Sequence, residues 1–158
     1  MVKKISDRAD ITRVLDSYRQ MEVLIAGAEL GVFDALAGGA LTAQQTARAI
    51  RTSARGTEIL LNALAALGAL EKRGGRFSLA PVARKHLVSG APEPMIAVVR
   101  HVSNLRRTWQ RLPESVRTGK PIPKTKKSTG KSDSQRRREF IAAMHEHALE
   151  TADALANK

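Results

Sequence analysis

The stretch "LAALGALEKRGGRFSLAPVARKHLV", residues 64–88, decides the fold. The first residues of this stretch form the end of a helix, which Gly68 terminates. The segments on either side of Gly74-Gly75 have the pattern of two paired strands. Pro81 suits the first turn of a following helix. Three side chains of this hairpin are expected to point into a core: Leu70, Phe77 and Leu79. Helix, two strands and helix in this order predict a winged-helix-like domain with a small β-hairpin wing.

Apolar residues at helical spacing predict that the chain around this wing is mainly α. A long amphipathic helix starts near Ile11 and ends near Gly31, and a short helix follows it. Leu30, Phe33 and Leu36 are expected to be the inward side chains of the short helix.

Capping residues and helix breakers set the bounds of the remaining helices. Thr42 followed by Gln45 predicts a capping box, and Ser53 is expected to cap the next helix. After the wing, the apolar pattern predicts a helical block over 94–119 with a kink at Pro113. A last helix is predicted over 134–158.

The helix over 57–67 stands where a DNA-binding winged helix places its recognition helix. On a helical wheel its apolar residues cover about 220° of the circumference. Arg55, Glu58 and Asn62 share the remaining face. We therefore expect this helix to be buried on two sides by protein, because recognition of base edges requires a polar face.

Positive charge is concentrated in one segment. The net charge is +12, and residues 120–138 contain eight Lys or Arg residues against one Asp. This composition predicts a mobile basic loop over 120–133, most simply a solvated charge run. A phosphate- or RNA-binding tract is the alternative.

Composition also restricts the chemistry and the compartment. The chain has no cysteine, which excludes disulfides, thiolate metal ligands and a cysteine nucleophile. The N-terminal residues are too polar for a signal peptide, and no apolar run is long enough to span a membrane. We therefore expect a cytoplasmic protein without membrane association.

Five stretches in order resemble a known family: "AGAELGVFDAL", "LTAQQTARAI", "LLNALAALGALEKRGGRFSLAPVARKHLVSG", "WQRLPESVRTGKP" and "REFIAAMHEHALETADALA". The chain resembles the N-terminal dimerisation domain of small-molecule O-methyltransferases that use S-adenosylmethionine. The resemblance implies flanking long helices that interlock in a homodimer, and a small aromatic or polyketide-like substrate. It implies a dimerisation domain over 1–119 and, over 134–158, a helix that leads into a Rossmann-like methyltransferase domain. The sequence departs from the family at 122–133.

The resemblance also implies which chemistry this chain lacks. The family holds S-adenosylmethionine on a glycine-rich loop between a strand and a helix, and no stretch here has that context. We expect no catalytic, cofactor-binding or metal-binding residue in this chain, so a full-length parent would supply the donor site. A related reaction in that parent, such as decarboxylation or hydroxylation, is a weaker alternative.

Two sets of side chains are candidates for binding. By resemblance, one set would wall a substrate pocket: His101, Trp109, Phe140, Met144 and His147. Core or dimer-contact packing is the simpler interpretation of that set. The other set lies on the wing: Lys72, Arg73 and Arg76. It would contact phosphates if the chain were a stand-alone winged-helix nucleic-acid-binding regulator, although an ordinary charged hairpin is favoured and nucleic acid is an unlikely partner.

Overall fold

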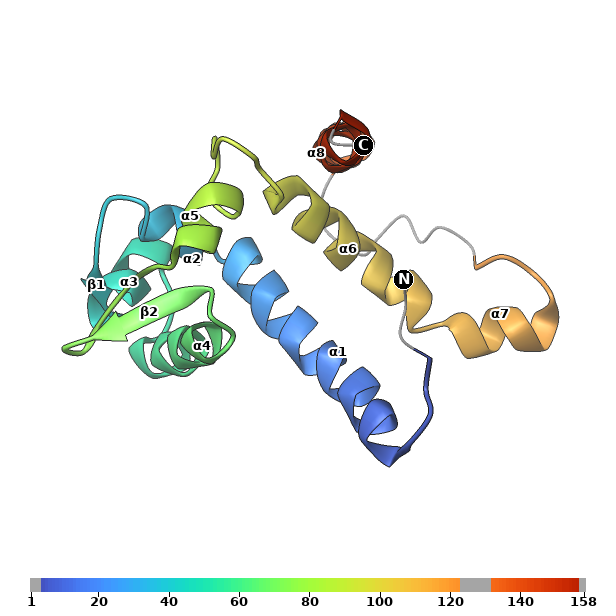
Figure 1. Ribbon diagram of the computed structural model, residues 1–158, viewed down its shortest axis with the longest axis horizontal. Coiled ribbons are helices and arrows are strands. Elements are labelled where there is room, and N and C mark those ends of the chain that lie inside the picture. The colour runs from blue at the N-terminus through green and yellow to red at the C-terminus, as the bar shows by residue number, and fades with distance from the viewer. Residues whose placement is uncertain (1–3, 123–131, 157–158) are drawn as a thin grey trace. The chain divides into compact units, whose positions relative to one another are not determined.

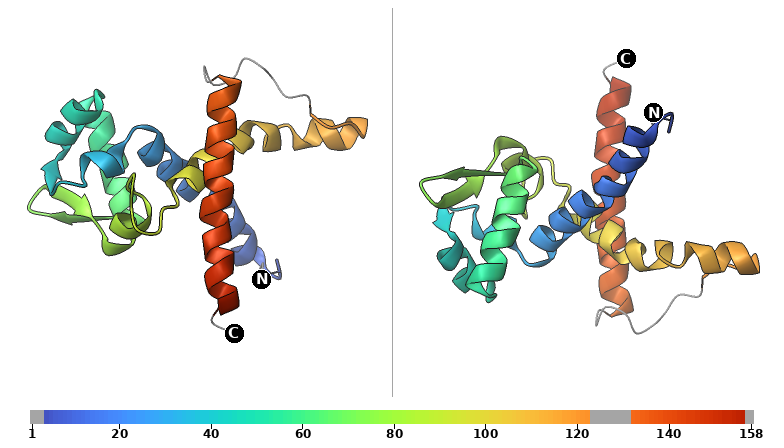
Figure 2. Two further views of the ribbon diagram at one scale, coloured as in Figure 1. Left: turned by 90° about the horizontal axis from the view of Figure 1, so that it is seen from above. Right: turned by 90° about the horizontal axis from the view of Figure 1, so that it is seen from below.

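The computed structural model describes residues 4–122 and 132–156, so most of the predicted basic loop over 120–133 lies outside the described residues. The chain forms two compact units, residues 1–91 and 92–158. Figures 1 and 2 show the elements of each unit. Among the helices that are described, none combines the length and the apolar character that a membrane span needs.

The first unit is a winged helix preceded by a long helix (Figure 1). Its elements are α1 (Arg8–Glu29), α2 (Val32–Ala35), β1 (Leu41–Thr42), α3 (Ala43–Ile50), α4 (Ala54–Ala66), β2 (Leu70–Arg73), β3 (Arg76–Leu79) and α5 (Pro81–His86). The predicted mainly helical, winged-helix-like fold is confirmed. The sheet, however, has three antiparallel strands in the order β1-β3-β2, because β1 pairs Leu41 with Phe77.

The wing is the hairpin of β2 and β3. Glu71 pairs with Ser78 and Lys72 with Phe77, and the turn between the strands is Gly74-Gly75. Both glycines have positive φ, 55° and 73°, which only glycine adopts at low cost. The hairpin expected from the sequence is therefore confirmed, including its three buried side chains, Leu70, Phe77 and Leu79.

The core of the first unit lies where α2, α4 and the end of α1 meet. Its largest fully buried apolar side chains are Phe33, Phe77, Leu36, Leu61, Leu64 and Val32. Helix α1 continues through Gly27 to Glu29. A Cβ at Gly27 would lie 3.1 Å from Leu64 Cδ1 and 3.2 Å from Phe33 Cζ, so this glycine permits close packing.

Two expectations about burial in the first unit were wrong. Leu30 is exposed rather than inward, because it is the C-cap residue of α1 and lies outside α2. Helix α4 is buried on one side only, through Thr57, Leu61 and Leu64. It packs on α1, α3 and β2, and Ile59 on another face is 63% exposed. The helical wheel therefore overestimated how much of the apolar surface of α4 is buried within the first unit.

The capping box at the start of α3 is confirmed. The amide of Gln45 donates to Thr42 Oγ1 at 3.2 Å, and the amide of Thr42 donates to Gln45 Oε1 at 2.9 Å. Ser53 caps α4 by a single bond, because its Oγ accepts from the amide of Gly56 at 3.1 Å. Local side-chain chemistry thus fixes both helix starts.

Removing this cap has a predictable effect on stability. We expect Thr42→Ala to lower the free energy of unfolding by about 1 kcal/mol, because an amide at the start of α3 loses its acceptor. Chemical denaturation followed by circular dichroism would measure it. Thr12→Ala is the control, because Thr12 lies exposed within α1, where alanine favours the helix. An equal loss in both variants would contradict the capping argument.

The described residues of the second unit form the helices α6 (Ile96–Trp109), α7 (Leu112–Thr118) and α8 (Asp133–Ala156). Helix α8 crosses and packs on α6, as both views of Figure 2 show. The kink expected at Pro113 is instead a break between two helices. Pro113 lies in the first turn of α7, where its missing N–H costs nothing.

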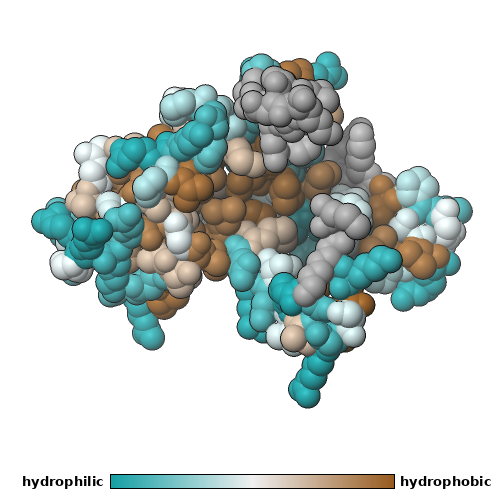
Figure 3. Space-filling view, in the orientation of Figure 1, coloured by the Kyte–Doolittle hydropathy of each residue, from teal (hydrophilic) through white to brown (hydrophobic). Residues whose placement is uncertain are grey.

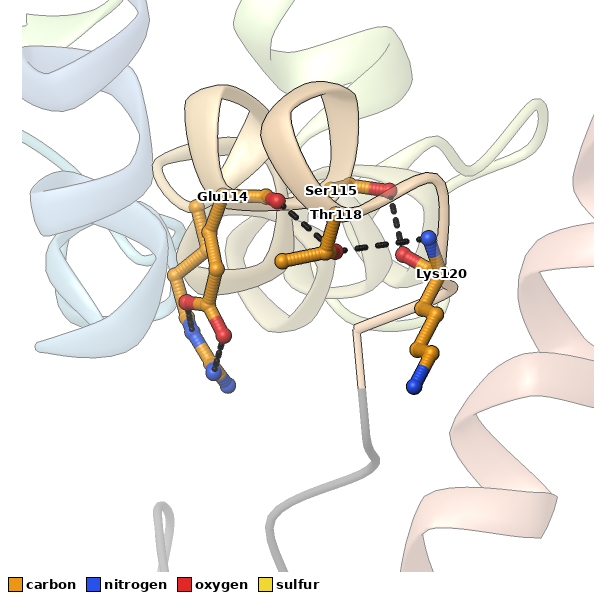
Figure 4. Close-up of polar contacts among 5 residues, drawn as sticks. Glu114, Ser115, Thr118 and Lys120 are labelled. Carbon is orange, nitrogen blue, oxygen red and sulfur yellow. Dashed lines mark hydrogen bonds and ion pairs between the residues drawn. The ribbon is translucent and has the colours of Figure 1, made fainter.

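The end of α7 is held by a small polar network (Figure 4). Ser115 Oγ donates to the carbonyl of Lys120 at 2.7 Å, and Thr118 Oγ1 donates to the carbonyl of Glu114 at 2.9 Å. Glu114 also accepts two hydrogen bonds from the guanidinium of Arg111. Gly119 closes the helix with a φ of 64°, as the sequence predicted.

Candidate functional site

An uncovered apolar stripe lies on the N-terminal half of α1. Four side chains at helical spacing form it, and we call them the α1 stripe: Ile11, Val14, Leu15 and Tyr18. They are between 49% and 65% exposed. The same line of residues continues to Ile25 and Ala28, which are buried in the core of the first unit. The α1 stripe thus has the composition of a buried surface without a cover.

Apolar side chains also reach the surface of the second unit. They lie on α6 and α7: Leu105, Trp109, Leu112 and Val116. Figure 3 shows apolar residues, in brown, among the hydrophilic ones on the visible face of the molecule. Exposed apolar surface of this extent marks interaction sites in soluble proteins.

The structure brings together two of the five side chains proposed for a pocket wall. The rings of His101 on α6 and Phe140 on α8 meet edge to face, with centroids 5.4 Å apart and planes at 60°. Met144 lies one turn beyond Phe140 and is exposed. Trp109, at the end of α6, is 66% exposed. The side chain of His147 lies outside the described residues.

Two carboxylates that the sequence reasoning missed join the same pair of helices. Glu146 Oε2 accepts from the amide of Val98 at 2.9 Å, and Glu139 Oε2 accepts from Asn104 Nδ2 at 3.1 Å. Glu146 is buried despite its charge. The signal available in the sequence was their spacing, because residues seven apart share one face of a helix.

The three wing cations have partners within the protein. Lys72 Nζ donates to Asn62 Oδ1 at 2.8 Å and lies 5.1 Å from the centroid of the Phe77 ring. Arg73 pairs with Glu71, and Arg76 donates to the carbonyl of Ala40. These contacts agree with an ordinary charged hairpin.

The described residues do not fit a site for S-adenosylmethionine. A donor loop needs glycines between a buried strand and a helix. Gly74-Gly75 lies between two strands of the hairpin, and Gly38-Gly39 lies between α2 and β1. Within residues 4–122 and 132–156, no cluster of three potential metal ligands occurs either. We therefore assign no catalytic, donor-binding or metal-binding role to any described residue.

A match to a protein-family model identifies the domain that carries the α1 stripe. The model described as the O-methyltransferase dimerisation domain matches residues 12–89. Residues 12–89 are an O-methyltransferase dimerisation domain. The matched range begins within α1 and ends just after the winged helix, so the dimerisation domain includes three of the four side chains of the α1 stripe: Val14, Leu15 and Tyr18.

Relatives and solved structures agree with the family match. The chain is 41% identical over 106 residues to the 3-hydroxy-5-methyl-1-naphthoate 3-O-methyltransferase of Streptomyces sahachiroi, an alignment that covers 65% of this chain and 31% of the relative. The structure of the N,N-8-amino-8-demethyl-D-riboflavin dimethyltransferase of Streptomyces davawensis superposes with a TM-score of 0.82 at 28% identity, over 97% of this chain and 48% of that chain.

A third match carries the methyl donor. The human N-acetylserotonin methyltransferase, solved in complex with S-adenosylmethionine, superposes with a TM-score of 0.69 at 28% identity, over 92% of this chain and 47% of that chain. The dimerisation-domain chain spans about a third of the curated relative and about half of the solved chains. These matches give no support to a nucleic-acid-binding regulator.

Proposed function

We propose that this chain is the dimerisation and substrate-cap part of an S-adenosylmethionine-dependent methyltransferase that works as a homodimer. The α1 stripe carries the proposal, because one continuous apolar line is covered at its C-terminal end and exposed at its N-terminal end. In a homodimer the same patch is available on both protomers, and burying it removes apolar surface from water.

The donor site of such an enzyme would come from residues other than the described ones. We propose a division into a dimerisation domain over 1–119 and a helical segment over 134–158 that leads into a Rossmann-like domain holding S-adenosylmethionine. The greater length of the relatives supports this division. Cytoplasmic localisation belongs to the same proposal.

The substrate would be a small aromatic or polyketide-like molecule. Support comes from the naphthoate named in one relative, and from the aromatic and thioether side chains on α6 and α8. Phe140 and Met144 lie on neighbouring turns, and Trp109 presents an exposed ring. Such side chains would cover the apolar face of an aromatic substrate and exclude water from it. Both O- and N-methyltransferases are among the matches.

Oligomeric state tests the proposal directly. Sedimentation equilibrium at micromolar concentration is expected to give about twice the 17.2 kDa mass of the chain. The dimer should persist in high salt, because its interface is apolar rather than ionic. A clean monomer under these conditions would refute the homodimer.

A further inference from the structure

The contact between α6 and α8 contains a cap supplied by the opposite helix. Helix α6 begins at Ile96, and its N-cap residue, Met95, makes no side-chain cap. Glu146 of α8 fills that role, because its carboxylate accepts from the amide of Val98, the third residue of α6. The third amide is the usual target of an N-cap side chain, and a negative charge is favourable at a helix N-terminus.

A second carboxylate holds the other end of the same contact. Glu139 accepts from Asn104, which lies six residues further along α6 than Val98. At 100° per residue, Glu139 and Glu146 lie on one face of α8, with the fully buried Ala143 between them. Phe140 and Met144 lie on the neighbouring flank of the helix. The two bonds therefore join α8 to α6 at two points on either side of the His101–Phe140 contact.

Apolar packing alone would favour this register of α8 along α6 only weakly over neighbouring registers. The buried side chains between the two bonds are the methyl group of Ala143 on α8 and the small hydroxymethyl group of Ser103 on α6. Phe140 and Met144 are exposed. Apolar contact is non-directional, whereas a hydrogen bond to a carboxylate requires a short distance and a defined angle. A slide of α8 by one turn would separate Glu146 from Val98 and leave a buried charge without this partner. Polar groups are known to set helix register in this way.

We propose that Glu139 and Glu146 are positioning residues that set the register of α8 on α6 and so place Phe140 and Met144 in the substrate-cap wall. This inference rests on the proposed function, since that function supplies the wall. The two carboxylates act through the helices and touch no substrate.

Amide exchange and ring contacts measured by NMR on the whole chain test the register. In Glu146→Ala the amide of Val98 should exchange about tenfold faster or more, because a charged acceptor is lost. Glu146→Gln keeps an acceptor and should exchange at an intermediate rate. The matched control is Glu114→Ala, which removes a carboxylate on α7 that pairs with Arg111. It should leave the rate at Val98 unchanged.

The ring contact separates register setting from simple stabilisation. In a variant with both Glu139→Ala and Glu146→Ala, molecules that keep their helical circular dichroism should lose the nuclear Overhauser contact between His101 and Phe140. Glu146→Gln should retain it. An unchanged contact in the folded double variant, or an unchanged Val98 rate in Glu146→Gln, overturns the proposal. If the double variant unfolds, the amide exchange rate of Val98 in Glu146→Gln is the measurement that tests the proposal.

These outcomes are independent of the test of dimerisation. A monomer that shows the expected exchange and contact changes would refute the homodimer and leave the register inference standing. A dimer that keeps the His101–Phe140 contact after both carboxylates are removed would refute the register inference and leave the homodimer standing.

Discussion

Phe33→Ala is expected to lower the free energy of unfolding of the first unit by about 3–5 kcal/mol. Phe33 is 1% exposed, and its ring lies against the backbone of α1 at Gly27. Helix α2 has only four residues, so few other side chains hold it to the core. The truncation would leave a cavity that the surrounding helices cannot fill without moving. Chemical denaturation at a fixed protein concentration would measure the loss.

Phe140→Ala is the matched control for this prediction. It removes the same atoms from a ring that is 47% exposed, so less apolar surface returns to water. We expect a loss below about 1 kcal/mol, including the contact with His101. Comparable losses in the two variants would contradict the location of the core in the first unit.

Leu15→Glu is expected to raise the dissociation constant of the proposed homodimer at least about a hundredfold. Leu15 is 65% exposed in the α1 stripe. Covering a leucine is favourable, whereas covering a carboxylate without a partner is strongly unfavourable. Since the substitution occurs in both protomers, its unfavourable contribution to the free energy of dimerisation occurs twice. Sedimentation equilibrium over a concentration series would measure the shift.

Gln20→Glu is the control for the α1 stripe. Gln20 lies on the opposite face of α1 by the helical repeat, and its substitution also adds one negative charge. We expect a dissociation constant within a few-fold of the wild-type value. Equal weakening by both substitutions would point to net charge rather than to the apolar stripe.

The sequence by itself determined the features that depend on local chemistry. Gly74-Gly75 specified the turn of the wing, because few other residues take its positive φ values. Thr42 with Gln45 specified the start of α3, since both bonds of the capping box lie within four residues. Hydrophobic periodicity located the helices and the buried side chains of the hairpin. The resemblance to the methyltransferase dimerisation domain rested on five stretches in order and was confirmed.

Only the tertiary structure decided which apolar faces are covered and which polar groups meet. Ile59 and Leu15 have the same chemistry as the buried leucines, and their exposure depends on what packs on α1 and α4. The pairing of β1 with β3 joins residues more than thirty positions apart. The cap on α6 comes from Glu146, almost fifty positions away. Local sequence patterns carry no information on such pairings, because these contacts are selected by the packing of whole elements.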